Sequence, residues 1–335
     1  MRKMIKHITV VGDGGWGTTL AVHLCKKHYQ VTLWGPFAAY LGSMRKSRYN
    51  PKFLPGIRLP NSLLLEGNLK KALLDSELIV FAVPSQYAAA VLKKVKRTNV
   101  NLSKKIFLSV TKGLDTKRLL RISEIISQEL GKMELAVLSG PTIAMEVAKG
   151  VPTTAVIASP SLKTAKHLQH IFNSSNFRIY TNTDVAGVEI GGSIKNIIAL
   201  ACGVCDGLGF GTNTKAAILT RGLAEMARLG SAMGAKAKTF VGLSGLGDLV
   251  TTCFNPKSRN RSVGELLGKG KSIREILKGM EMVAEGVETV KAAYSLSLRH
   301  NIPMPITHEI YHIIYRHKNP LKAVSDLMQR KPKSE

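Results

Sequence analysis

Acidic residues are scarce in this chain of 335 residues. It contains 22 Asp and Glu against 48 Lys and Arg, so its formal net charge is +26 at pH 7. Such an excess favours anionic partners, whether nucleic acid, a membrane surface or phosphorylated metabolites. The basic residues are spread widely, without interleaved aromatics or a recognisable nucleic-acid module. We therefore expect a solvated basic surface and no nucleic-acid partner.

Cysteines and long apolar runs are also few. The four cysteines are too scattered for a disulfide scaffold in a chain of this length. Cys202 and Cys205 have the spacing of half a metal site, but no second pair accompanies them and the histidines show no ligand spacing. We predict that both are core residues and that the protein holds no metal. No apolar run reaches bilayer length, and the run at 8–11 is too short for a signal-peptide core. These absences predict a cytoplasmic protein without an integral membrane segment.

Glycine is most informative in the stretch HITVVGDGGWGTTL, residues 7–20. A β-branched apolar run precedes Gly12, Gly14 and Gly17, a helix-compatible segment follows, and a second strand is predicted at 30–34. In this context G-x-G-x-x-G indicates dinucleotide binding rather than a merely flexible turn. Gly12 would permit the tight turn, Gly14 the approach of a pyrophosphate, and Gly17 close packing of helix on strand. The helix N-terminus would offer N–H groups to the phosphates.

No acidic residue lies between Asp13 and Glu66. Turns of this type usually have an Asp or Glu about 20 residues after the glycines, which accepts the ribose 2′-hydroxyl of NAD. Here the second strand ends in Trp34-Gly35-Pro36, and three basic residues follow at 45, 46 and 48. A 2′-phosphate should therefore meet no repulsion, and we predict that NADP(H) is at least as acceptable as NAD(H).

The length of the chain predicts two domains. Further strands are predicted at 77–83, 105–110, 135–138, 153–157 and 177–180, alternating with helices, whereas the Pro-punctuated stretch 50–61 is predicted to be loop. This alternation is typical of a doubly wound, mostly parallel α/β sheet. Beyond residue 184 nearly every segment has a helical pattern. We predict a dinucleotide-binding domain over 1–186 and an all-helical domain over 187–335.

Short motifs follow the predicted strands and helices throughout the chain. They are Gly12-x-Gly14-x-Trp16-Gly17, Pro84-Ser85-Gln86, Thr111-Lys112-Gly113, Ser139-Gly140-Pro141-Thr142-x-Ala144-x-Glu146, Gly192-x-x-Lys195-Asn196, Asp206-Gly207-x-Gly209-x-Gly211-x-Asn213-Thr214-Lys215, Arg221-Gly222, Gly245-x-Gly247-Asp248-Leu249 and Ser258-Arg259-Asn260. Together and in this order they resemble the motifs of NAD(P)-dependent glycerol-3-phosphate dehydrogenases. The resemblance implies a Rossmann domain followed by a helical domain like that of 6-phosphogluconate dehydrogenase. It also implies reversible reduction of dihydroxyacetone phosphate to sn-glycerol 3-phosphate, which feeds phospholipid synthesis, in an enzyme that is commonly a homodimer.

The resemblance assigns roles to individual residues. Lys195 matches the proton acceptor of alcohol oxidation. The substrate contacts it implies are Lys112, Gly140, Thr142, Asp248, Ser258, Arg259 and Asn260. The cofactor contacts it implies are Gly12, Gly14, Gly15, Trp16, Gly17, Lys112, Ala144, Arg259, Val283 and Glu285. The chain departs from the family pattern in three places. Thr142 stands where Ser is usual and Ile143 where an aromatic residue is common. Gly35-Pro36 stands where the family often has His or Arg, so the resemblance assigns no contact to the adenosine 2′ position.

The chemistry supports these roles independently. Hydride transfer to a carbonyl carbon leaves negative charge on the oxygen, which needs a proton donor and fixed positive charge beside it. We expect burial and neighbouring cations such as Lys112 and Arg259 to lower the pKa of Lys195, and Asp248 to orient it. Arg259 has the planar fork suited to a phosphate.

Two other hypotheses remain open at this point. Because a fold alone does not determine a substrate, the chain could be a β-hydroxyacid or another polyol-phosphate dehydrogenase. It could also be a non-catalytic, basic protein that senses NADP or associates with nucleic acid. The last hypothesis predicts salt-sensitive polynucleotide binding.

Overall fold

The computed structural model describes residues 5–280, 284–332 and 334 as two compact units. Unit 1 consists of the chain up to Lys112 together with Arg121–Val185, and unit 2 of Gly113–Leu120 together with the chain from Ala186 onward. The assignment of residues 113–120 to unit 2 differs from the single domain boundary predicted at residue 186. The Gly113 N–H donates to Ser193 Oγ over 2.9 Å, and Leu114 packs in the core of the helical unit. These long-range contacts leave no signal in the local sequence.

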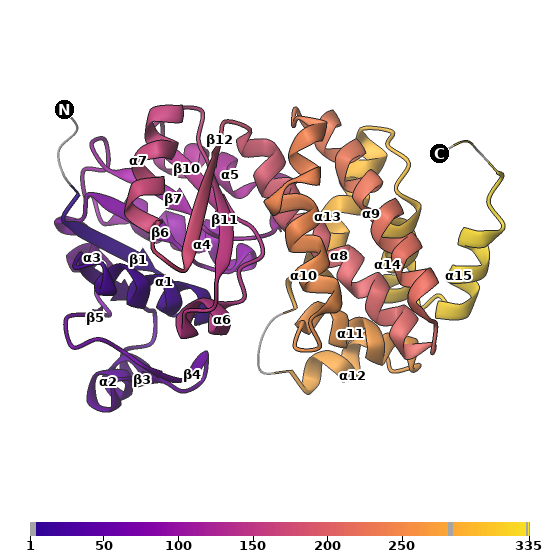
Figure 1. Cartoon of the computed structure of the whole chain (residues 1–335), viewed down its shortest axis with the longest axis horizontal. Helices are drawn as coiled ribbons and strands as arrows, with labels where there is room; N and C mark the ends of the chain where they lie inside the picture. Colours follow the sequence, from indigo (N-terminus) through magenta and orange to yellow (C-terminus); the bar gives the residue numbers. More distant parts are fainter. Residues whose placement is uncertain (1–4, 281–283, 333, 335) are drawn as a thin grey trace. The chain divides into compact units, whose positions relative to one another are not determined.

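Unit 1 is built on an eight-stranded sheet in the order β12-β11-β10-β7-β6-β1-β2-β5 (Figure 1). The strands are β1 (His7–Val11), β2 (Gln30–Trp34), β5 (Leu64–Glu66), β6 (Leu78–Phe81), β7 (Ile106–Ser109), β10 (Glu134–Ser139), β11 (Thr153–Ala158) and β12 (Phe177–Asn182). β10 and β11 are antiparallel, and the other described neighbours in this sheet are parallel. The predicted doubly wound sheet is confirmed. The sequence analysis missed β5, whose three residues are too few to show a period.

The helices of unit 1 cover a sheet whose central strands are apolar on both faces. All four residues of β6, Leu-Ile-Val-Phe, are buried, as expected for a covered parallel strand. The helices are α1 (Gly15–Lys26), α2 (Ala38–Ser47), α3 (Leu69–Leu74), α4 (Ser85–Arg97), α5 (Ile122–Leu130), α6 (Ala144–Lys149) and α7 (Leu162–Phe172). Val11 pairs with both Trp34 and Phe81, so β1, β2 and β6 end side by side. This common edge is where open α/β sheets place their ligands.

The stretch predicted as loop at 50–61 contains a small antiparallel hairpin, β3 (Tyr49–Asn50) and β4 (Leu54–Arg58), beside α2 in Figure 1. Pro51, Pro55 and Gly56 hide its strand pattern. The fully buried Asn50 anchors it, because the Asn50 amide donates over 2.8 Å to both Asp13 O and Thr18 Oγ1. Helix α5 begins at Ile122, after the short strands β8 (Leu114–Asp115) and β9 (Leu120–Arg121).

Unit 2 is helical apart from its short extended segments near residues 114–120, with α8 (Val185–Gly207) at its centre (Figure 1). The other elements are α9 (Thr212–Ala232), the 3-10 helix η1 (Ala237–Val241), the π-helical turn η2 (Leu243–Gly247), α10 (Asp248–Phe254), α11 (Arg259–Gly268), α12 (Ile273–Lys278), α13 (Glu285–Arg299), α14 (Pro305–Tyr315) and α15 (Pro320–Met328). By length and composition α8 alone, among the described helices, could cross a membrane, but every residue of its apolar window is buried in the protein. A core helix passes the same test.

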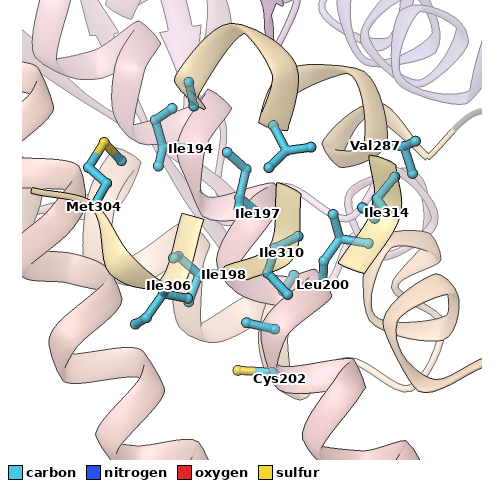
Figure 2. Close-up of a cluster of buried hydrophobic side chains, with 14 of the residues drawn as sticks. Ile194, Ile197, Ile198, Leu200, Cys202, Val287, Met304, Ile306, Ile310 and Ile314 are labelled. Carbon is cyan, nitrogen blue, oxygen red and sulfur yellow. The ribbon is translucent and has the colours of Figure 1, made fainter. Parts of the chain in front are cut away.

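The core of unit 2 surrounds the apolar side chains of α8. Figure 2 shows Ile194, Ile197 and Ile198 facing side chains of the α14 region, among them Met304 and Ile310. Burial of each such side chain contributes about 1.5–3 kcal/mol. Cys202 and Cys205 are buried and form no disulfide, which confirms the prediction that both are core residues.

One acid in this core has a structural task. Glu225 of α9 is 1% exposed and accepts hydrogen bonds from the backbone N–H groups of Ile306 and Thr307 and from Thr307 Oγ1. It therefore satisfies N–H groups at the start of α14 that the helix itself leaves without partners. Burial raises the pKa of Glu225, although these hydrogen bonds work in the opposite direction.

Candidate functional site

The glycine turn between β1 and α1 needs glycine at two positions for its own folding. Gly12 has φ +121°, and a Cβ there would lie 2.7 Å from the Ala82 carbonyl oxygen. A Cβ on Gly17 would overlap the Gly12 carbonyl. A Cβ on Gly14, by contrast, would project into open space. Packing against the described residues therefore does not require glycine at 14, whereas close approach of the turn backbone to a ligand would.

The start of α1 suits an anion. Gly14 is its N-cap, and no side chain caps the helix, so the first-turn N–H groups are not taken by a capping side chain. These groups and the helix dipole favour a phosphate. Ala144 at the start of α6 lies beside this turn, because Thr19 Oγ1 donates to Ala144 O over 3.1 Å and a Cβ on Gly15 would lie 3.8 Å from Ala144 Cβ. The turn and Ala144 are thus brought together, and they fit a dinucleotide pyrophosphate.

The surroundings of the β2 end differ from the sequence expectation. Asp13, inside the glycine turn, is 7% exposed and its carboxylate occupies the space that a side chain on Gly35 would need. Asp13 Oδ2 is buried without a hydrogen-bond partner among the described residues. Burial raises the pKa of Asp13. The expectation that a 2′-phosphate meets no repulsion at this strand end rested on the residues after the turn, and it stays a prediction.

Two of the three basic residues expected near that strand end bind the protein itself, while Lys46 is exposed. Arg45 donates through Nε and Nη2 to the Leu65 carbonyl, at 3.1 and 2.5 Å. Arg48 donates to the carbonyls of Pro60 and Leu63. Both guanidinium groups thus hold the segment before and within β5.

Three predicted substrate or cofactor residues meet at the ends of β7 and β10. Lys112 Nζ donates to the Gly140 carbonyl over 3.0 Å and to Thr142 Oγ1 over 3.5 Å. Gly140 has φ +139°, and a Cβ there would lie 3.0 Å from Ala155 Cα. Glycine at this position is therefore required by the backbone. The cluster combines a cation and a hydroxyl, as binding of a phosphorylated ligand would need.

Lys195 forms a buried cluster in unit 2. Its Nζ lies 2.5 Å from Asp248 Oδ1 and 2.6 Å from Thr252 Oγ1, and its side chain is 7% exposed against 2% for Asp248. Thr252 Oγ1 also donates to the Asp248 carbonyl over 2.7 Å. The carboxylate at this distance stabilises the ammonium form and directs the Nζ atom. Thr252 was not among the predicted site residues. It lies four residues after Asp248, a spacing that places two side chains on one face of a helix, but α10 was not predicted.

The motif 258–260 divides between structural and exposed positions. Ser258 Oγ caps α11 by accepting from the Arg261 N–H. Asn260 is buried, and its Oδ1 accepts from the Gly286 N–H over 3.0 Å, next to Glu285 at the start of α13. Arg259 is exposed. Of Ser258, Arg259 and Asn260, Arg259 is thus the one with an exposed side chain. Val283, a predicted cofactor contact, lies outside the described residues.

A further ion cluster joins the end of α8 to α11. Asp206 pairs with Lys215 and with Arg261, whose Nε lies 2.6 Å from Asp206 Oδ2. Although burial works against it, these hydrogen bonds lower the pKa of Asp206. Arg261 was not among the predicted site residues.

Comparison with known proteins now decides the family. The chain matches the models described as NAD-dependent glycerol-3-phosphate dehydrogenase N-terminus, over residues 7–165, and C-terminus, over residues 184–325. The chain belongs to this family. It is similar to the glycerol-3-phosphate dehydrogenase [NAD(P)+] of Prosthecochloris aestuarii, with 47% identity over 98% of this chain and 99% of the relative. The same identity holds for the enzyme of that name from a Thermoanaerobacter species, over 98% of each chain.

Solved structures of the family agree. The glycerol-3-phosphate dehydrogenase of Coxiella burnetii is 37% identical and superposes with a TM-score of 0.93, covering 97% of this chain and 99% of that one. The resemblance inferred from the motifs is confirmed, and so is the fold class of a Rossmann domain followed by a helical domain.

Proposed function

We propose that this protein catalyses the reversible NAD(P)H-dependent reduction of dihydroxyacetone phosphate to sn-glycerol 3-phosphate. Unit 1 is the proposed dinucleotide-binding domain, and unit 2 carries the proposed catalytic lysine and the phosphate-binding arginine. The single observation that carries the proposal, in a chain of this family, is the buried cluster of Lys195, Asp248 and Thr252. A buried lysine held by a carboxylate and a hydroxyl is what acid–base work at a carbonyl oxygen requires.

Lys195 is the proposed acid–base group. The bound nicotinamide cofactor supplies or accepts the hydride. The Lys195 ammonium donates a proton to the substrate oxygen during reduction, and the neutral amine accepts it during oxidation. Its positive charge stabilises the developing oxyanion, while Asp248 and Thr252 hold Nζ in one direction.

Phosphate recognition is assigned to Arg259. Its exposed guanidinium at the start of α11 can form a bidentate contact, and Ser258 and Asn260 fix the backbone on either side. Lys112, Gly140 and Thr142 are the proposed substrate contacts of unit 1. Arg259→Ala should mainly raise KM for the phosphorylated substrate, and an equal effect on an unphosphorylated ketone would contradict this role.

The glycine turn is the proposed cofactor site. The open space at Gly14 and the absence of a capping side chain on α1 support this assignment for residues 12–17. Ala144, beside the turn, and Lys112 are proposed cofactor contacts in unit 1. For unit 2 the proposed contacts are Arg259 and Glu285, together with Val283 from the resemblance alone.

The test is cofactor oxidation with dihydroxyacetone phosphate against a panel of keto acids. We expect turnover of the ketone phosphate and a kcat loss of at least about a hundredfold in Lys195→Ala, because general acid catalysis contributes about 10²–10⁴-fold. Lys238→Ala, which changes an exposed lysine of the same unit, is the control. Activity confined to keto acids would favour the alternative dehydrogenase, and unchanged turnover in Lys195→Ala would refute the catalytic assignment. Salt-sensitive polynucleotide binding without turnover would favour the non-catalytic hypothesis.

We further propose that the enzyme is a cytoplasmic homodimer whose product supplies phospholipid synthesis. Family membership supports the dimer and the metabolic role, and the four free cysteines agree with a reducing compartment. Light scattering of the purified chain tests the dimer, and a monomeric mass in the active enzyme would exclude it.

A further inference from the structure

The end of β2 carries an acid that comes from another part of the chain. In dinucleotide-binding turns the residue that receives the adenosine ribose lies at the end of the second strand. Here that place is Gly35, and the space of its missing side chain is filled by the Asp13 carboxylate. The Gly12 N–H donates to the Trp34 carbonyl over 2.9 Å, so the turn that holds Asp13 is fastened to this strand end. A carboxylate thus lies at the β2 end although the sequence of β2 has none.

The Asp13 carboxyl group is held in place, but one of its oxygens has no hydrogen-bond partner among the described residues. The backbone of Asp13 is fixed, since its carbonyl accepts from the Asn50 amide over 2.8 Å and from Thr18 Oγ1 over 3.2 Å. The side chain is buried, yet Oδ2 has no hydrogen-bond partner within the described part of the chain. A buried acceptor without a partner is destabilising, and a structural aspartate would normally have one. The unused acceptor therefore points to a ligand group.

Two of the three basic residues that follow β2 donate to the protein itself. The guanidinium groups of Arg45 and Arg48 donate to backbone carbonyls of the 60–65 segment. The Asp13 carboxyl group, by contrast, lies directly against Gly35 at the β2 end.

We propose that Asp13 is the residue that makes this enzyme select NAD(H) over NADP(H), by accepting the adenosine 2′-hydroxyl and repelling a 2′-phosphate. This inference rests on the proposed function and deepens it by naming the preferred cofactor. A carboxylate is an acceptor only, so it suits a hydroxyl donor. A 2′-phosphate brings further negative charge to a site from which water is largely excluded, where repulsion is weakly screened.

The test measures binding of two cofactor fragments, ADP-ribose and 2′-phospho-ADP-ribose, by isothermal titration calorimetry. We expect the wild-type chain to bind ADP-ribose at least about tenfold more tightly, which corresponds to about 1.4 kcal/mol. Asp13→Asn keeps an acceptor oxygen and removes the charge, so it should strengthen binding of the phosphorylated fragment and bring the ratio of the two affinities close to one. Asp13→Ala removes the acceptor too, so it should also weaken binding of ADP-ribose. Asp75→Asn removes one exposed negative charge of unit 1 and should leave the ratio unchanged.

The outcomes separate this inference from the proposed function. Equal ratios in wild type and Asp13→Asn, in a preparation that oxidises NADH with dihydroxyacetone phosphate, would overturn the inference alone. A wild-type preference for the phosphorylated fragment would do the same. If neither fragment binds and no turnover is seen, the proposed function fails and the inference falls with it.

Discussion

The ion pair between Lys195 and Asp248 should be strongly coupled because it is buried. With Nζ and Oδ1 2.5 Å apart, the charges attract by about 7 kcal/mol at an effective dielectric constant of about 20, before the cost of desolvation is subtracted. Lys195→Met or Asp248→Asn alone leaves one buried charge without its partner, and each should cost about 3–5 kcal/mol of unfolding free energy. The double variant leaves no such charge. Its cost should fall short of the sum of the single costs by at least about 2 kcal/mol.

An exposed ion pair with the same distance between nitrogen and oxygen provides the control. Lys269 Nζ also lies 2.5 Å from Glu265 Oε1, but these side chains are 53% and 38% exposed. The cycle built from Lys269→Met and Glu265→Gln should give a coupling of about 0.5 kcal/mol or less. The comparison therefore varies burial while the distance stays fixed.

The assay is urea unfolding followed by far-ultraviolet circular dichroism, which is dominated by helices. Both tryptophans, Trp16 and Trp34, belong to unit 1, so their fluorescence follows a unit that contains none of the substituted residues. Transitions that differ between the two probes are to be fitted separately. Equal couplings in the buried and exposed pairs, or additive costs for Lys195 and Asp248, would refute the reasoning.

Two further predictions concern unit 1. Gly14→Ala should fold normally yet lose dinucleotide affinity, whereas Gly17→Ala should destabilise the unit, because its Cβ would overlap the Gly12 carbonyl. Thermal melts measure the stability of the two variants, and titration with ADP-ribose measures their affinity. Equal losses of stability in both variants would contradict this prediction. Burial lowers the pKa of His23 from 6.5 to about 4, with Nε2 2.7 Å from the Phe172 carbonyl. The neutral ring therefore contributes stability that is present above pH 6.5 and is lost as the pH falls toward 4, up to about 3 kcal/mol. Urea unfolding of wild type and His23→Gln across this range should converge at low pH, and a constant difference would exclude the shift.

Much of the architecture could be predicted because it depends on local patterns. The continuous apolar strands, the alternation with helices and the glycine turn each leave a period or a spacing in the sequence. Motif order was enough to indicate the family. The hairpin at 49–58 escaped prediction because prolines and a glycine mask its strands, and its anchor is the long-range contact of Asn50 with the glycine turn.

The site itself shows where sequence reasoning stops. The family resemblance and the chemistry predicted that Asp248 orients Lys195, but Thr252 was identified only in the structure, where α10 is a helix. Asn260, predicted to contact substrate, uses its Oδ1 on the Gly286 backbone.

The sequence by itself determined the strands of the main sheet except β5, the longer helices, the turn that suits a pyrophosphate and the family. Only the tertiary structure decided that residues 113–120 belong with the helical unit and that Asp13 fills the place of a side chain at Gly35. The physical reason is that periodicity and spacing record contacts between near neighbours along the chain. The position of one carboxylate against a distant strand depends on how the strands pair, which no local pattern contains.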